Sequence, residues 1–173
     1  PYEKYDAASS TAGDTVHDLS SLPVVTVNGV EYYRFDWRLD VNKDGTYEYE
    51  EDVEIVDTLP SGMILYENND YLKYSTGGSS STNQLTTTPW YQFRYSYDKG
   101  TNKINLVKTG YSTTYWTFYY STLVKVDDVK NGVYKNGTVA FKNTVQDKSG
   151  KYPERSQTQT VKAVSYTHLT LPS

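Results

Sequence analysis

The sequence of 173 residues contains no cysteine. This absence excludes disulfide bonds, cysteine-ligated zinc and thiol nucleophiles. Small secreted domains often rely on disulfides because their cores are limited, so a domain of that kind would need another source of stability here. These residues contain no recognisable signal peptide and no apolar run long enough to span a membrane, so no membrane partner is expected.

Basic charge is sparse as well. The 17 Lys and Arg residues stand against 21 Asp and Glu, which gives a formal net charge of -4, and the pI is about 5.2. No cluster of basic residues forms a patch, which argues against a nucleic-acid partner. Long helix-forming stretches rich in Ala, Leu, Glu and Lys are also missing.

Aromatic residues, in contrast, are abundant: they make up 15% of the chain, with 19 Tyr. Tyr favours the pleated, half-buried surface of a strand and brings a polar tip to it. Turn signals recur about every ten residues, which is typical of an all-β sandwich. The predicted strands are residues 32–39, 46–58, 63–66, 90–97, 103–108, 113–127, 139–146 and 158–164. Lys99-Gly100 is predicted to form a turn, and the Gly-, Ser- and Thr-rich segment 75–89 a long exposed loop with room for a short edge strand.

Three residues in separate segments have side chains that could react with one another if the fold brought them together. Lys4 is the only lysine among the first 42 residues, Asp57 ends the segment VEIVD, and Asn143 lies within the predicted strand 139–146. In this order and spacing the chain resembles the isopeptide-forming domains of Gram-positive surface adhesins, of the collagen-adhesin A type, with kin among fimbrial pilins and the C-terminal domains of streptococcal antigen I/II. That family has a Lys on its first strand, an Asp just before a segment like TLP, and an Asn near the start of its last long strand. The resemblance covers nearly all of residues 1–164.

The resemblance implies an immunoglobulin-like, Greek-key β-sandwich for residues 1–164. It also implies an isopeptide bond between Lys4 and Asn143 that Asp57 assists, in a stalk or adhesion module rather than an enzyme. The expected location is the bacterial cell wall, and the expected partners are neighbouring domains of the same surface protein. The last residues, AVSYTHLTLPS, resemble a translated sequencing adapter, so residues 165–173 are expected to be an artefactual or disordered tail.

The chemistry of such a bond can be argued from the residue types. An amine attacks a carboxamide only when neutral, whereas a free lysine is charged at pH 7. Burial lowers the pKa of a lysine and raises that of an aspartate, which would keep Asp57 protonated. A protonated Asp57 can polarise the Asn143 carbonyl and pass protons to the departing ammonia. The hypothesis requires the first strand to lie beside the last, with Asp57 reaching both; otherwise Lys4 is a solvated residue near a frayed terminus.

A second pattern is the spacing of a calcium-binding loop in residues 40–51, DVNKDGTYEYEE. The candidate ligands are Asp40, Asn42, Asp44 and Glu51. The flanking residues have the alternation of strands rather than the pattern of helices, so a plain hairpin turn is the favoured interpretation. On that interpretation the domain needs no cofactor.

The aromatic residues of 91–97 and 115–120 allow two interpretations. They can form the core and cross-strand ladders of the sandwich, which we favour. Alternatively they can form a sugar-binding platform beside the loop 75–89. In that case the chain would be a ligand-binding module for a glycan or a host protein, in a surface protein or a secreted glycosidase.

Overall fold

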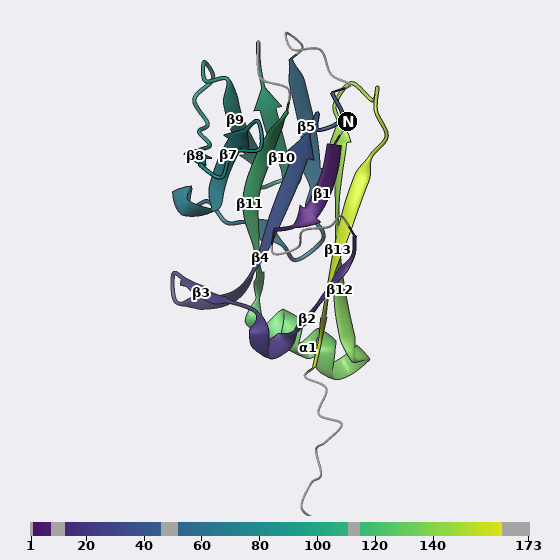
Figure 1. The fold of residues 1–173 in the computed structure, drawn as a ribbon. Coiled ribbons are helices and arrows are strands. Elements are labelled where there is room, and N and C mark those ends of the chain that lie inside the picture. Colours follow the sequence, from purple (N-terminus) through teal and green to yellow (C-terminus); the bar gives the residue numbers. More distant parts are fainter. Residues whose placement is uncertain (1, 8–12, 46–51, 111–114, 164–173) are drawn as a thin grey trace, which may run out of the picture.

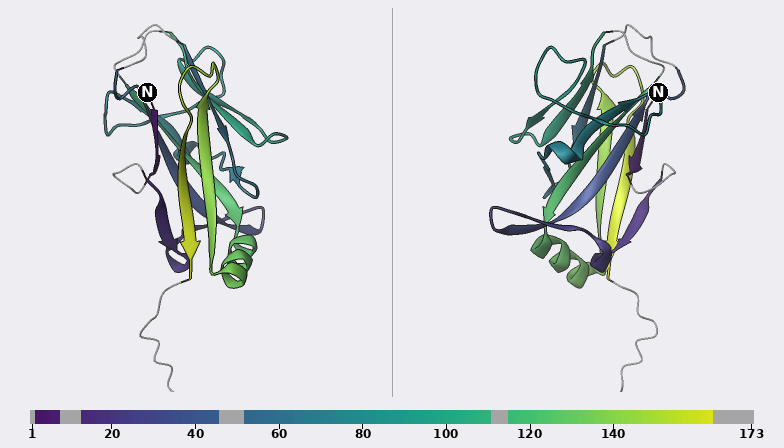
Figure 2. Two further views of the ribbon diagram at one scale, coloured as in Figure 1. Left: turned by 90° about the vertical axis from the view of Figure 1, so that its right-hand side faces the viewer. Right: turned by 60° about the vertical axis from the view of Figure 1, so that its left-hand side comes forward.

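The computed structural model describes residues 2–7, 13–45, 52–110 and 115–163, which form two β-sheets packed against each other (Figure 1). The two further views show the sheets as separate layers (Figure 2). An all-β sandwich was predicted from the sequence, and this fold class is confirmed. Within the described ranges, no helix is both long enough and apolar enough to cross a membrane.

The first sheet runs in the order β1-β4-β11-β7-β8, with β3 paired to β4 and β6 paired to β11. All of these pairs are antiparallel. Its strands are β1 (Tyr2–Asp6), β3 (Val24–Val27), β4 (Val30–Val41), β6 (Ile64–Leu65), β7 (Leu72–Thr76), β8 (Asn83–Gln84) and β11 (Trp116–Lys125).

The second sheet runs in the order β2-β13-β12-β5-β10-β9. The pair of β13 and β2 is parallel, whereas its other pairs are antiparallel. Its strands are β2 (Thr15–Asp18), β5 (Val53–Thr58), β9 (Phe93–Asp98), β10 (Lys103–Lys108), β12 (Thr138–Asp147) and β13 (Arg155–Lys162).

The core lies between the sheets and follows the alternation of the sequence. Along β4, Phe35, Trp37 and Leu39 point inward and are buried. From the other sheet, Ile104 and Leu106 of β10 face them as part of the same hydrophobic core. Because side chains of a strand alternate between its two faces, one buried face fixes the register of each of these strands.

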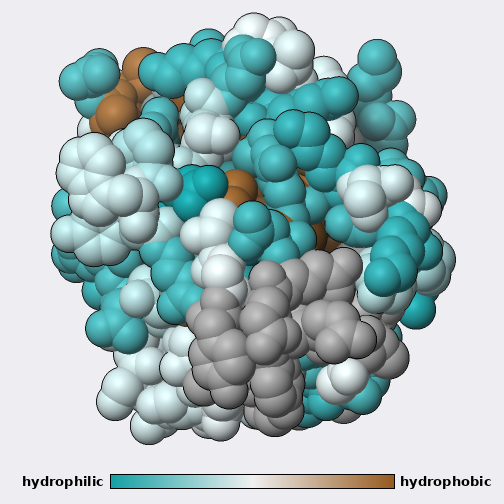
Figure 3. Space-filling model, turned by 90° about the horizontal axis from the view of Figure 1, so that it is seen from above, coloured by the Kyte–Doolittle hydropathy of each residue, from teal (hydrophilic) through white to brown (hydrophobic). Residues whose placement is uncertain are grey.

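One helix was not predicted from the sequence. The helix α1 (Val126–Asn136) follows β11 directly and leads into β12, at one end of the sandwich (Figure 1). It buries Val126, Val129 and Val133 on one face, at the spacing that a helix requires. It ends at Gly137, whose φ of 84° suits glycine and whose N–H bonds the Val133 carbonyl at 2.7 Å. Seen from the opposite end, the visible surface of the molecule is mostly hydrophilic (Figure 3).

The hairpin predicted at residues 40–51 is wrong. β4 belongs to the first sheet and β5 to the second, so the segment between them crosses from one sheet to the other. In contrast, the Lys99-Gly100 turn is confirmed, since it joins β9 to β10 with Asp98 opposite Lys103. The predicted exposed loop 75–89 contains the short, exposed edge strand β8, but its first two residues belong to β7, and Ser75 and Leu85 are buried. Residues 46–51, 113–114 and 164 of the predicted strands lie outside the described residues, as does the predicted tail, residues 165–173.

Candidate functional site

Four polar side chains from four strands meet in the interior between the sheets. Lys4 of β1 and Tyr120 of β11 come from the first sheet. Asp57 of β5 and Asn143 of β12 come from the second sheet. At most 1% of the surface of any of them is exposed. The structure therefore brings together all three residues that the sequence singled out and adds a tyrosine.

The positions of these residues follow from strand alternation. Asp57 continues the inward face of β5 after Val53 and Ile55, where another apolar residue would be expected. Asn143 likewise interrupts an inward face of β12. Asp57 pairs with Val145 across the two strands, so Asn143 is its diagonal neighbour on the same face. Two polar residues thus stand at core positions of adjacent strands.

The Oδ2 atom of Asp57 is the centre of the cluster. It accepts a hydrogen bond from Asn143 Nδ2 at 3.1 Å and lies 3.4 Å from Lys4 Nζ. The Tyr120 hydroxyl donates to the same oxygen and accepts from Lys4 Nζ. Within the described part of the chain, Oδ1 of Asp57 and Oδ1 of Asn143 are buried without a hydrogen-bond partner. Both of these oxygens are hydrogen-bond acceptors. A proton on Asp57 would provide the O–H donor that they lack.

Burial changes the protonation equilibria of the cluster. Removal from water lowers the pKa of Lys4 to about 8, although the nearby Asp57 carboxylate opposes this change. Burial also raises the pKa of Asp57, against the opposite effects of the Lys4 charge and the hydrogen bonds from Tyr120 and Asn143. The Lys4 ammonium lies 4.3 Å from the ring centroid of Tyr120 and 4.6 Å from that of Trp37. The environment thus makes the neutral amine and the neutral acid more accessible than they are in water.

The expected arrangement of strands needs a correction. β1 is hydrogen-bonded to β4 and not to the strand that carries Asn143. That strand, β12, lies between β13 and β5 in the opposite sheet, and β13 follows it in the chain. Lys4 therefore reaches Asp57 across the interior of the sandwich, whereas Asn143 reaches the same Asp57 oxygen from a neighbouring strand of its own sheet. A bond between them would join the two sheets, not two neighbouring strands.

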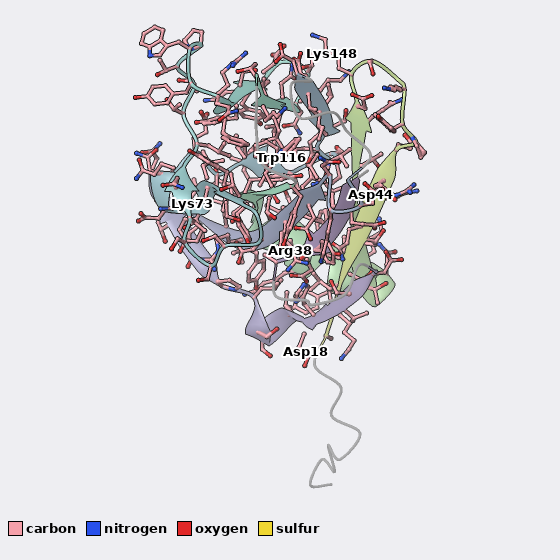
Figure 4. All side chains as sticks on the ribbon, turned by 45° about the horizontal axis from the view of Figure 1, so that its top comes forward. Asp18, Arg38, Asp44, Lys73, Trp116 and Lys148 are labelled. Carbon is pink, nitrogen blue, oxygen red and sulfur yellow. The ribbon has the colours of Figure 1, made fainter. Side chains whose placement is uncertain are left out.

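Sequence reasoning assigned Tyr120 to the core and did not connect it with Lys4. Alternation does place Tyr120 inward together with Trp116 and Phe118, all of which are buried. Figure 4 shows Trp116 well inside the molecule. Of these three inward aromatic residues, only the tyrosine has a hydroxyl group. A buried hydroxyl needs a polar partner, and this need was the sequence signal that could have linked Tyr120 to the cluster.

The candidate calcium ligands are placed less favourably. The Asp40 carboxylate accepts from Thr117 Oγ1 at 3.0 Å and lies 3.3 Å from Arg38 Nε. Asp44 is exposed at the edge of the molecule (Figure 4), and Glu51 lies outside the described residues. Asp40 is thus already engaged by two protein groups, which does not favour the calcium-loop interpretation.

Comparison with known proteins shows similarity in structure only. No family model matches the chain, and no curated protein matches it. Among solved structures, the major pilin subunit of Bacillus cereus matches with a TM-score of 0.50 and 9% identity, over 95% of this chain and 40% of that one.

Two adhesin domains have lower scores. The collagen-binding domain of a Staphylococcus aureus adhesin matches with a TM-score of 0.47 and 15% identity, over 93% of this chain and 96% of that one. The collagen-binding subdomain of an Enterococcus faecalis surface protein gives 0.46 and 17%, over 85% and 93%. At these identities the likeness concerns the fold: Gram-positive adhesin and pilin domains are among the structures that this all-β sandwich is similar to.

Proposed function

We propose that this chain is a structural module of a bacterial cell-surface adhesin or pilus that cross-links itself through an isopeptide bond between Lys4 and Asn143. The observation that carries the proposal is that Lys4 and Asn143 both contact Asp57 Oδ2, with all three side chains buried in the interior. The similarity of the fold to a pilin subunit supports the cell-surface part of the proposal. Neighbouring domains of the same surface protein would be its partners.

The reaction follows from the contacts of Asp57. Neutral Lys4 Nζ attacks the Asn143 side-chain carbonyl carbon, and ammonia leaves from the same carbon. Asp57, protonated at the start, polarises the carbonyl and returns a proton to the departing nitrogen. Half a turn of the Asn143 carboxamide would place its Oδ1 where Nδ2 now contacts Asp57 Oδ2. The fold supplies proximity, which contributes about 7–11 kcal/mol in favourable intramolecular reactions. The reaction runs once, so the module does not turn over.

Bond formation would also remove an energetic cost of the unreacted site. A buried ion pair is stabilised by its own attraction, yet each ion loses hydration worth several kcal/mol. Condensation replaces the Lys4 ammonium by an uncharged amide and leaves Asp57 free to remain neutral. The closed loop would further constrain the unfolded chain, by analogy with a disulfide, by on the order of 4–5 kcal/mol. In a chain without cysteine, this is a route to stability that needs no thiol.

Intact mass spectrometry tests the proposal. The folded chain is expected to be lighter than its sequence mass by one ammonia molecule, because the condensation expels it. Lys4→Ala and Asn143→Ala should each remove this difference. Lys142→Ala, which removes an exposed lysine next to Asn143, should keep it. Digestion should yield one fragment that joins the residues around Lys4 to residues 143–148. A folded sample at full sequence mass would contain only a non-covalent ion pair and would refute the bond.

A second candidate function is glycan binding, favoured by exposed aromatic residues beside a polar groove. Trp90 is 82% exposed and Tyr91 is 55% exposed, just before β9. Tyr91 lines a groove of about 540 Å³ whose other walls carry amide and hydroxyl groups. The polar lining includes Asn69, Asn83, Gln84, Thr86 and Thr88. Aromatic faces with a few convergent polar groups are suited to a neutral, hydroxyl-rich ligand.

Glycan binding is tested on a glycan array, followed by titration of any glycan that binds. Trp90→Ala is expected to weaken the binding by at least about 10-fold, a loss of 1.4 kcal/mol, with no change in folding because the side chain is exposed. Tyr134→Ala removes another aromatic residue that is 73% exposed, on α1, and should bind normally. An array without binding, or binding equally weakened in both variants, would contradict this function.

A further inference from the structure

The hydroxyl group of Tyr120 occupies a position that the reaction described above leaves unused. It is buried, and it contacts both the attacking atom, Lys4 Nζ, and the assisting carboxyl, Asp57 Oδ2. Any role for it in bond formation rests on the proposed function. The hydroxyl lies between two groups that must exchange a proton, so it is placed to take part in that exchange.

The hydrogen bonds of this group have one direction. The Lys4 ammonium can only donate, so the Tyr120 oxygen must accept from it. The single hydroxyl proton of Tyr120 is then free to point at Asp57 Oδ2, which accepts it. The direct contact between Lys4 Nζ and Asp57 Oδ2 is 3.4 Å, beyond the usual range of a strong hydrogen bond. The shorter route from the amine to the carboxyl therefore passes through the tyrosine oxygen.

We propose that the Tyr120 hydroxyl is a proton relay between Lys4 and Asp57 while the isopeptide bond forms. As the bond from Nζ to the Asn143 carbon forms, Nζ becomes positive and acidic. Asp57 has by then given its proton to the carbonyl oxygen of Asn143 and is a carboxylate. Nζ therefore gives a proton to the Tyr120 oxygen, and Tyr120 gives its own proton to Asp57. Asp57 returns a proton to Nδ2 as the bond from the carbon to Nδ2 breaks. The carbonyl oxygen then returns its proton to Asp57, so neutral Lys4 and Asn143 yield the amide and one ammonia, and both Asp57 and Tyr120 end as they began.

The surroundings of Tyr120 suit a relay and not a proton store. Burial and the adjacent Asp57 raise the pKa of Tyr120 well above its ordinary value, so no phenolate accumulates. The ring is held by the core on β11, with its face toward the Lys4 ammonium. Connected hydrogen bonds of this kind polarise one another, which eases the passage of a proton along them.

The test compares rates of bond formation in the wild type and in Tyr120→Phe. Unreacted chain is recovered from inclusion bodies in urea, its full sequence mass is checked, and the reaction is started by dilution into buffer. Samples quenched in acid are followed by intact mass. Tyr120→Phe keeps the ring and is expected to lose ammonia about 100-fold more slowly, at the low end of what a positioned proton-transfer group contributes. Tyr97→Phe removes a hydroxyl that bonds Asn102 at 2.7 Å, away from the cluster, and should react at the wild-type rate.

A solvent isotope measurement separates a relay from a packing effect. In mixtures of light and heavy water, the wild-type rate should fall along a curve, because more than one proton moves in the same step. For Tyr120→Phe the same plot should become linear. This readout on the wild type also holds if the variant does not fold. Circular dichroism of the refolded samples shows whether folding is equal.

The outcomes distinguish this inference from the proposed function. A wild type that never loses ammonia overturns the isopeptide bond itself, and with it the relay. A wild type that reacts while folded Tyr120→Phe reacts equally fast overturns only the relay. A linear isotope plot for the wild type also overturns the relay. A slower variant with the wild-type curve retained assigns Tyr120 to packing alone.

Discussion

Asp57→Ala is expected to keep the full sequence mass and to lose much of its resistance to urea. The substitution removes the acid that assists the bond, so Lys4 and Asn143 stay unjoined. It also leaves the Lys4 ammonium buried without its counter-charge, which costs about 3–5 kcal/mol when one partner of a buried pair is removed. With the constraint of the bond also lost, the total is on the order of 7–10 kcal/mol. This is comparable to the whole stability of a typical domain.

A double variant separates these two losses. Lys4→Met with Asp57→Leu also lacks the bond but carries no buried charge. It should therefore recover the electrostatic part of the loss, since replacing both partners of a buried pair by apolar residues is often neutral or better. Urea unfolding of the wild type, Asp57→Ala and the double variant gives the free energy lost with the bond and the free energy lost to the unpaired buried charge. An Asp57→Ala chain that is lighter by one ammonia, or as stable as the wild type, would contradict the role of Asp57.

Under force, the cross-linked chain is expected to extend far less than the open chain. With handles on the two ends, tension entering near Lys4 would pass through the bond to Asn143. It would then act only on the residues that follow, which are the end of β12 and β13. At about 3.5 Å per extended residue, the gain in length should be below about 100 Å. Lys4→Met, which cannot form the bond, should gain on the order of 500 Å.

Optical-trap or force-microscopy measurements of contour length check this expectation. Lys142→Met, which removes an exposed lysine beside Asn143 and leaves the cluster intact, should extend as little as the wild type. A wild type that extends over its full length in a single step would show that no covalent bridge carries the tension. The measurement needs no assumption about how much the bond contributes to the free energy of unfolding.

Much of the sandwich could be predicted because its strands have one buried face. The alternation of β4 and β10 specifies which side chains point inward, and the structure agrees at these positions. The same rule identifies Asp57 and Asn143 as polar residues at core positions. That Lys4 and Asn143 would meet at Asp57 was predicted from the order of the three residues, on a resemblance whose individual motifs are short.

Other features depend on information that alternation does not contain. Turn chemistry after β4 indicates a change of direction, but it does not say whether the chain returns in the same sheet or crosses to the other. The helix α1 was missed because β11 runs straight into it without a turn signal. Its own signals were present, in the spacing of Val126, Val129 and Val133 and in Gly137. The short strand β2 pairs with β13, far along the chain, so nothing near it in sequence predicts the partner.

The pairing of Lys4 with Leu39 in β1 and β4 has one more consequence. A slip of one residue would turn the lysine to the other face of its sheet, away from Asp57 and Asn143. The amide could then form only in a molecule whose two sheets had closed with β1, β5 and β12 in their proper registers. Each cross-linked molecule would therefore be one that had folded correctly. In a mixed population, the fraction of molecules that are lighter by one ammonia would equal the fraction that had reached this fold.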